Sequence, residues 1–289
     1  MNKEALALVI AGACLHAVWN LCAKKAAGGL PFIWLFGVVS IVVSLPFGFF
    51  AWHAHSQQLT GQAWLAIVVS ALIHVAYSLV LQKGYRESDF SVVYPLARGT
   101  GPLFAVLGAI VFLGESPSVL GCLGIAAILV GIFIVSGVGK IAAVERKKVT
   151  AGIFWGCLTG AFIAAYTVVD GWAVKSLGLA PVLYYVLGLA LRTLVLAPQA
   201  LRQPQALRQQ WQKNSRHIIA VGVLSPLAFS LALQAMVIAP LSYVAPVREL
   251  SMLLGVVLGG WILREAISMF RVVGAVFMIA GVVLLAVAK

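Results

Sequence analysis

Seven ionisable side chains lie inside long apolar stretches of this 289-residue chain: His16, His74, Arg98, Asp170, Arg192, Arg248 and Glu249. A charged side chain at the centre of a bilayer costs about 2.5–3.5 kcal/mol on insertion scales, so each one needs a partner or a water-filled cavity. Groups of this kind mark the paths of ions and solutes through membranes. We therefore expect them to line a polar cavity.

The charges of this set do not balance. With neutral histidines, three arginines face two carboxylates, which leaves a net charge of one positive unit. A spare guanidinium suits a carboxylate, phosphate or phosphonate group, because its planar fork can donate two parallel hydrogen bonds. Arginines that only tie together helix ends or acids are the structural alternative. The balance favours an anion-binding role for at least one arginine.

Helical spacing gathers further polar residues beside the ionisable ones. His16, Trp19 and Asn20 lie three and four residues apart, so they share one helix face. The same relation holds for His74, Tyr77 and Ser78, for Tyr94 and Arg98, and for Tyr166 and Asp170. A polar stripe of this kind is expensive against lipid, so these faces should point inward. The histidines can be hydrogen-bonded core residues or proton carriers, and the aromatic residues can be packing groups or membrane-interface anchors.

The elements that position these residues are membrane-spanning helices. The chain is 62% hydrophobic and 10% charged, with a mean hydropathy of +1.05, which a single soluble core cannot accommodate. A spanning helix needs about 20 mostly apolar residues. Ten segments meet this need, and they predict an all-α polytopic membrane protein: Ala5–Ala23, Pro31–Ala51, Ala63–Leu81, Phe90–Leu113, Val119–Gly137, Ala151–Val174, Pro181–Leu201, His217–Ile238, Leu241–Leu263 and Met269–Ala288. The connecting segments 53–62 and 202–216 are predicted to be loops.

The chain also repeats itself after about 150 residues. The segment Ala76–Gln82 returns as Ala228–Gln234, each reading Ala-aromatic-Ser-Leu-x-Leu-Gln. Because each copy holds an odd number of spans, the two halves must lie in opposite orientations, as in many secondary transporters. The domains are therefore predicted as a first five-helix repeat over 1–140, a basic linker over 141–150 and a second five-helix repeat over 151–289.

The repeat also pairs residues of opposite charge. Arg98 in the fourth span corresponds to Glu249 in the ninth, at an offset of 151 residues. An ion pair between them that forms and breaks as the two halves move is a specific hypothesis. The fourth span also carries Gly101-Pro102, at which we expect an interrupted helix. The glycines of the fifth and tenth spans predict a closely packed or dimerising edge.

The formal net charge of +12 is scattered over short loops, which excludes the continuous basic face of a nucleic-acid-binding protein. Fourteen of the 20 lysine and arginine residues fall on one side of the predicted topology and three on the other. Because cytoplasmic loops retain basic residues, this bias predicts that the linker is cytoplasmic and that both termini are outside. The expected location is the inner (plasma) membrane.

In its motifs the chain resembles the drug/metabolite transporter superfamily, in the branch of two EamA-type halves with five spans each. The likeness is carried by Gly114-Glu115 and Arg264-Glu265 after the fourth and ninth spans, by the glycine-spaced fifth and tenth spans, and by the repeated Ala-aromatic-Ser-Leu-x-Leu-Gln segments. Arg264 departs from the glycine of the first half. The resemblance implies a ten-helix carrier of small metabolites, often directed outward.

The function expected from these observations is secondary transport of a small anionic or zwitterionic metabolite by alternating access, with export favoured. Two alternatives stay open: a non-transporting receptor or assembly subunit, and a membrane-embedded lipid-modifying enzyme. No metal-ligand cluster, nucleotide-binding glycine loop or catalytic motif occurs, so we expect neither an enzyme nor a cofactor. The expected partners are the small-molecule substrate and the lipid bilayer, with protons as an open second solute, no nucleic acid, and a monomer or homodimer.

The substrate cavity is predicted from thirteen residues: His16, Trp19, Asn20, His74, Tyr77, Ser78, Tyr94, Arg98, Tyr166, Asp170, Arg192, Arg248 and Glu249.

Overall fold

The computed structural model describes residues 1–26, 28–88, 90–136, 146–254, 257 and 269–288, which are helical and contain no strand. A π-helical turn, η3 (Trp172–Ser176), follows α6, and a short 3₁₀ turn, η1 (Ser56–Gln58), follows α2. The α-helices are α1 (Lys3–Ala26), α2 (Gly29–His55), α3 (Gly61–Glu87), α4 (Phe90–Leu113), α5 (Val119–Ser136), α6 (Arg146–Gly171), α7 (Pro181–Leu201), α8 (Pro204–Ile238), α9 (Leu241–Arg248) and α11 (Met269–Val287).

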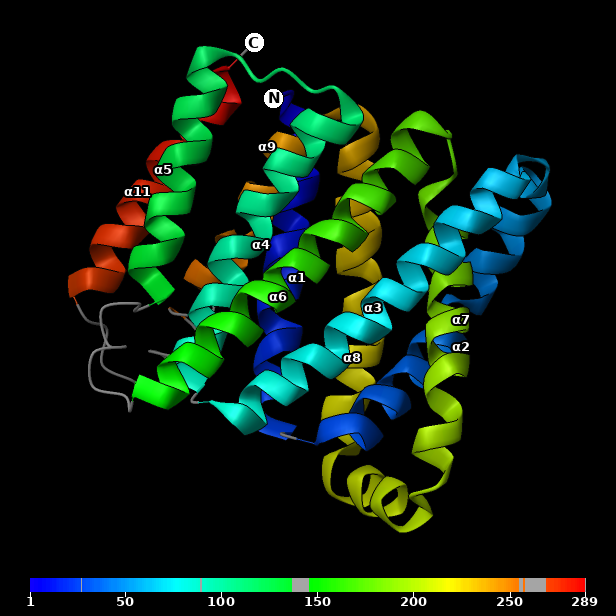
Figure 1. The fold of residues 1–289 in the computed structure, drawn as a ribbon. Helices are drawn as coiled ribbons and strands as arrows, with labels where there is room; N and C mark the ends of the chain where they lie inside the picture. The colour runs from blue at the N-terminus through cyan, green and yellow to red at the C-terminus, as the bar shows by residue number, and fades with distance from the viewer. Residues whose placement is uncertain (27, 89, 137–145, 255–256, 258–268, 289) are drawn as a thin grey trace.

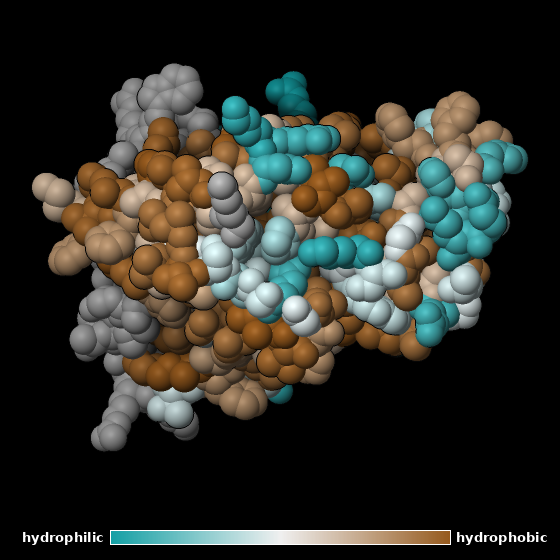
Figure 2. All heavy atoms as spheres, turned by 90° about the horizontal axis from the view of Figure 1, so that it is seen from above, coloured by the Kyte–Doolittle hydropathy of each residue, from teal (hydrophilic) through white to brown (hydrophobic). Residues whose placement is uncertain are grey.

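Eight of the described helices are long and apolar enough to cross a bilayer, and α5 is a shorter apolar helix. Seen from above, apolar side chains predominate around the rim of the bundle, and hydrophilic ones gather in patches over the end that faces the viewer (Figure 2). Large apolar side chains such as Phe50, Phe112 and Phe270 are more than two-thirds exposed, which suits contact with lipid tails. The predicted all-α polytopic membrane protein is confirmed.

The two halves of the repeat pack against each other through several pairs of helices. Helix α1 packs against α8, and the equivalent helices α6 and α3 pack against each other in the same way. Two further pairs, α2 with α7 and α5 with α11, join equivalent helices of the two halves (Figure 1). The polar faces of both halves therefore meet in the middle of the molecule.

The halves run in opposite directions. Helix α1 begins at the end of the bundle that carries the N label, and α6 begins at the opposite end (Figure 1). The amino group of Met1 donates hydrogen bonds to the carbonyl oxygens of Leu285 and Ala288 at 2.7 and 2.9 Å, so the start of α1 lies beside the end of α11. The α7–α8 turn, which carries Arg202, lies at the other end (Figure 1).

The interrupted helix lies in the second half, not in the first as predicted. Helix α4 continues through Gly101 and Pro102, and the hydroxyl of Thr100 donates to the carbonyl oxygen of Leu96 at 2.6 Å. Helix α9 instead ends at Arg248, and helical structure resumes at 250–254, so the predicted ninth span is broken at Glu249. The remainder of that predicted span lies outside the described residues. The break places a non-helical turn at an ionisable residue.

The predicted loop 202–216 is also wrong, because α8 begins at Pro204 and includes most of it. The backbone leaves helical geometry at Asn214, where φ is −127°. The amide of Asn214 donates to the side-chain oxygen of Gln210 at 2.8 Å and to the carbonyl oxygen of Ala26 at 3.3 Å. These bonds stabilise a kink, so the first turns of α8 lie across the end of the bundle (Figure 1).

Glycines allow α5 and α11 to approach at backbone distance. A Cβ atom built on Gly131 would lie 2.6 Å from the carbonyl oxygen of Gly274, and one built on Gly281 would lie 2.6 Å from that of Gly124. Small residues at such crossings let two helices pack closely in lipid, where the hydrophobic effect does not drive their association. The glycine stripes predicted to form a packing or dimerising edge thus serve packing within the chain.

We predict that Gly274→Ala lowers the free energy of unfolding in detergent micelles by about 1–3 kcal/mol, because the added methyl group overpacks the α5–α11 contact. Gly188→Ala in α7 is the matched control, since a Cβ there meets nothing within 4 Å. Its unfolding free energy should stay the same or rise by up to about 1 kcal/mol through better helix propensity. Equal unfolding midpoints for the two variants would contradict this packing role.

Glu115 joins the turn after α4 to the start of α9. Gly114 adopts a left-handed conformation with φ of 67°, as is common directly after a helix end, and the amide of Glu115 donates to the carbonyl oxygen of Ala109. The Glu115 carboxylate accepts hydrogen bonds from the backbone amides of Leu241 and Ser242 at 2.8 and 2.9 Å. It therefore caps the positive end of α9 across the boundary between the halves.

The pKa of Glu115 is held below its usual value. Burial opposes ionisation, but the backbone hydrogen bond from Ser242, the one from Leu241 and the contact with Lys175 Nζ at 3.1 Å outweigh it. A carboxyl group whose pKa falls on folding stabilises the protein above its unfolded pKa, about 4.3, and loses this contribution as the pH falls through the folded value.

We predict that Glu115→Gln destabilises the protein by about 1–2 kcal/mol at neutral pH, since it removes the charge from the helix end. The difference from wild type should shrink below about pH 4.3, where the wild-type carboxylate is also neutralised. Chemical unfolding in micelles across this pH range measures it. A difference that is constant with pH would show that the charge of Glu115 is not what stabilises the turn.

Candidate functional site

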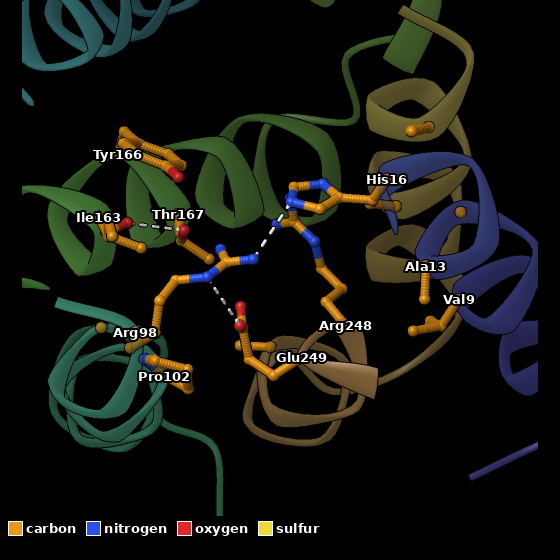
Figure 3. Close-up of a pocket in the computed structure, with 16 residues that line it drawn as sticks. Val9, Ala13, His16, Arg98, Pro102, Ile163, Tyr166, Thr167, Arg248 and Glu249 are labelled. Atoms are coloured by element: carbon orange, nitrogen blue, oxygen red, sulfur yellow. Dashed lines mark hydrogen bonds and ion pairs between the residues drawn. The ribbon is translucent and has the colours of Figure 1, made fainter. Parts of the chain in front are cut away.

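A small cavity of about 40 Å³ lies between α1, α4, α6, α8 and α9 at the centre of the bundle (Figure 3). It has room for a few water molecules but not for a metabolite. The polar side chains that line it are His16, Arg98, Tyr166, Thr167, Arg248 and Glu249. Both halves of the repeat thus contribute to one polar site, which is small in this conformation.

Small residues surround the polar groups and leave space for them. Gly12 and Ala13 on α1 lie one turn from His16, and Gly101 on α4 lies near Arg98. Alanines from α8 and α9 complete this part of the wall. A lining of small residues keeps the centre of a membrane bundle from filling with side chains, so modest movement of the helices enlarges the cavity.

Arg98 and Glu249 form an ion pair across the repeat. Arg98 Nε lies 3.4 Å from Glu249 Oε2, and the two side chains are 18% and 11% exposed. Neither of these two atoms makes a geometrically acceptable hydrogen bond among the described residues. An Arg98 side-chain nitrogen also lies 3.4 Å from His16 Nε2 (Figure 3). The structure thus brings together the residues that the repeat pairs, in a loose contact that can open.

Arg248 has different contacts from Glu249, its neighbour in the sequence. Among the described residues it has no carboxylate partner, and its guanidinium carbon lies 5.4 Å from the centre of the Phe229 ring. The Phe229 ring in turn lies 5.2 Å from that of Tyr185, whose hydroxyl accepts a hydrogen bond from Arg192 at 3.1 Å. Two guanidinium groups therefore flank one aromatic pair.

Asp170 lies behind the cavity in a cluster of hydroxyl groups. Its Oδ1 atom accepts hydrogen bonds from Ser70 on α3 and Tyr184 on α7, both at 2.6 Å. Its Oδ2 atom lies 3.8 Å from His74 Nε2. The His74 ring stacks on Tyr166, with ring centres 3.9 Å apart, and so connects Asp170 to the cavity wall.

Five of the thirteen predicted cavity residues line the cavity: His16, Arg98, Tyr166, Arg248 and Glu249. Five more lie around it, since His74 and Asp170 form the adjoining cluster, Tyr77 lies edge-on to Tyr166, Tyr94 lies beneath Arg98, and Arg192 bonds to Tyr185.

Trp19, Asn20 and Ser78 do not line the cavity in this conformation. Trp19 meets the His16 ring edge-on but packs with the apolar residues around Phe32 and Ile218. The Ser78 hydroxyl donates to the carbonyl oxygen of His74 on its own helix. The stripes of His16 and His74 thus each contain residues that lie at or around the cavity and residues that do not.

The thirteen predicted cavity residues do not include Ser70, Tyr184 or Thr167. Ser70 could have been found, because it lies four residues before His74 and extends the same polar stripe by one turn. Tyr184 and Tyr185 are both polar residues of the predicted seventh span, and only the packing of α7 shows that Tyr184 reaches Asp170. Among the described residues, no three histidines, cysteines or acids come together to hold a metal ion.

We predict that Arg98→Glu and Glu249→Arg each lower the free energy of unfolding by about 3–5 kcal/mol, because each leaves a buried charge unpaired. The double variant should recover most of this loss, since it restores an opposite pair. Arg208→Glu, on the exposed surface of α8, controls for a simple change of charge. Losses that add in the double variant would argue against direct pairing.

Comparison with known proteins agrees with this architecture. The sequence profile of the EamA-like transporter family matches residues 3–137 and 150–287. A crystal structure of another protein covers 99% of this chain and 97% of its own length, with a TM-score of 0.74 at 15% identity, which shows a shared fold. Among curated protein sequences, none matches this one.

Proposed function

The chain belongs to the EamA-like transporter family, and on this premise we propose that it is a secondary carrier for a small anionic or zwitterionic metabolite, which it exports from the cell. The observation that carries the choice of substrate class is the guanidinium of Arg248, which lines the cavity without a carboxylate partner in the described part of the chain. A carboxylate, phosphate or phosphonate would complete its hydrogen bonds.

The charge balance of the neighbouring groups supports the same class of substrate. Arg98 is matched by Glu249, and Asp170 is satisfied by two hydroxyl groups, so neither carboxylate neutralises Arg248. Arg192 adds a second cation without a carboxylate partner among the described residues, and it lies beyond Tyr185. A cation would meet repulsion here, whereas an anion would meet two guanidinium groups in a site sheltered from water.

The small volume of the cavity supports transport by alternating access. Because a metabolite does not fit within about 40 Å³, binding requires the two halves to separate on one side at a time. The Arg98–Glu249 pair joins α4 of one half to the end of α9 in the other, so it must lengthen during this movement. An anion that binds Arg98 competes with Glu249 and thereby assists the opening.

The proposed location is the plasma membrane, with both termini outside. The termini lie at the end of the bundle opposite the α7–α8 turn, whose Arg202 and Arg208 suit the cytoplasmic side.

The proposal is tested by ligand-induced stabilisation of the purified protein with phosphoenolpyruvate, 2-aminoethylphosphonate and choline as anionic, zwitterionic and cationic probes. We expect the first two to raise the unfolding temperature and choline to leave it unchanged. Arg248→Gln should weaken the binding of these probes about 10–100-fold, the effect of losing charge-assisted hydrogen bonds.

Arg208→Gln removes the same charge from the surface and should bind like wild type. Uptake of the radiolabelled probe into proteoliposomes then separates a carrier from a binding protein. Stabilisation by choline alone, or equal affinity in the two glutamine variants, would overturn the proposed substrate class.

A further inference from the structure

Asp170 is a buried carboxylate that forms no ion pair with lysine or arginine among the described residues. It is 2% exposed, and the described carboxylates that pair with lysine or arginine are Glu115 and Glu249. Two short hydroxyl bonds reach Oδ1, whereas Oδ2 has only the His74 ring at 3.8 Å, beyond hydrogen-bond distance. An ionisable side chain buried in a membrane span without an ion-pair partner is a candidate functional group.

The groups around Asp170 connect three helices of both halves. Ser70 and His74 approach from α3 of the first half, and Tyr184 approaches from α7 of the second. An ionised carboxylate holds two hydroxyl donors strongly, and a protonated one holds them less strongly. Protonation would therefore loosen the contact between α3 and the α6–α7 pair, which must slide past each other when the cavity changes sides.

The backbone beside Asp170 also departs from regular geometry. The π-helical turn η3 begins at Trp172, directly after Gly171. Such turns interrupt the hydrogen-bond ladder of a helix and recur at functional sites. The carboxylate thus lies where α6 changes its geometry, which is a suitable place for a local change to alter the course of the helix.

The charge of Asp170 also affects the cavity. Tyr166 lies four residues earlier on the same face of α6 and lines the cavity, and His74 stacks on its ring while facing Asp170. The other charged and titratable groups described around this cluster are Tyr77 from α3, Tyr184 and Arg192 from α7, Arg98 from α4 and Arg248 from α9, while α8 contributes the Phe229 ring. A charge that appears at Asp170 therefore changes the field at the arginines that would hold an anion.

We propose that Asp170, supported by Ser70, Tyr184 and His74, is a proton-binding site that couples transport to a proton gradient and is distinct from the anion site at Arg98 and Arg248. The proton binds to Oδ2 when the site is open to the more acidic side and leaves when it opens to the other. This inference rests on the proposed carrier function, since coupling has meaning only where a solute moves.

The first test needs no substrate. Infrared difference spectra of the purified protein between about pH 5 and about pH 8 report protonated carboxyl groups directly. We expect a protonated-carboxyl band that is lost in Asp170→Asn and retained in Glu249→Gln. Asparagine keeps an oxygen that accepts from Ser70 and Tyr184, so this variant should fold. A band that is unchanged in Asp170→Asn overturns the proton site.

The second test separates coupling from transport. Proteoliposomes that contain 2-aminoethylphosphonate are assayed for exchange at equal pH and for accumulation driven by a pH gradient. We expect wild type to show both exchange and accumulation. Asp170→Asn should retain exchange, but its gradient-driven accumulation should be at least about 10-fold lower than that of wild type.

The outcomes distinguish this inference from the carrier proposal. Exchange in wild type that ignores the pH gradient overturns coupling and leaves the carrier intact. Loss of exchange as well as accumulation in Asp170→Asn, in protein that still unfolds at the wild-type temperature, assigns Asp170 to the translocation path and overturns a separate coupling role. If no probe moves in wild type, the substrate class fails, and the infrared result still decides whether Asp170 binds a proton.

Discussion

The structure depends on one constraint, which is that lipid offers no partner to a buried charge or to an unpaired backbone group. Several polar contacts cross from one half of the chain to the other. Arg98 on α4 meets Glu249 after α9, Ser70 on α3 meets Asp170 on α6, and Glu115 after α4 caps the start of α9. Because apolar helices gain little from each other in lipid, these contacts and close backbone packing hold the halves together.

The contacts between the two halves differ in strength. The cap by Glu115 has short hydrogen bonds to two backbone amides, and the glycine contact between α5 and α11 leaves no space for a side chain. The Arg98–Glu249 pair is longer and lacks aligned hydrogen bonds. Movement of the halves should therefore begin around the cavity, while the α5–α11 pair and the cap persist as fixed points. This division is what a carrier requires, since it must open a central site without coming apart.

Much of the candidate site was predictable because burial in lipid makes charges conspicuous. Arg98 and Glu249 could be paired from the repeat alone, since equivalent positions of inverted halves approach the same depth. The break in α9 could not be predicted in the same way. Both α4 and α9 contain proline, yet α4 continues through Pro95 and Pro102, whereas α9 ends at Arg248, two residues after Pro246. The type of residue alone therefore does not determine where a helix ends.

The sequence alone determined the membrane class, the inverted repeat and the helix faces, because all three follow from hydropathy, length and periodicity along the chain. The tertiary structure decided which of these faces meet. It showed that Arg248 lies against Phe229 while its neighbour Glu249 reaches Arg98, and that Tyr184 rather than Tyr185 bonds to Asp170. Adjacent residues on a helix point about 100° apart, so only the position of the surrounding helices determines which of them reaches the centre.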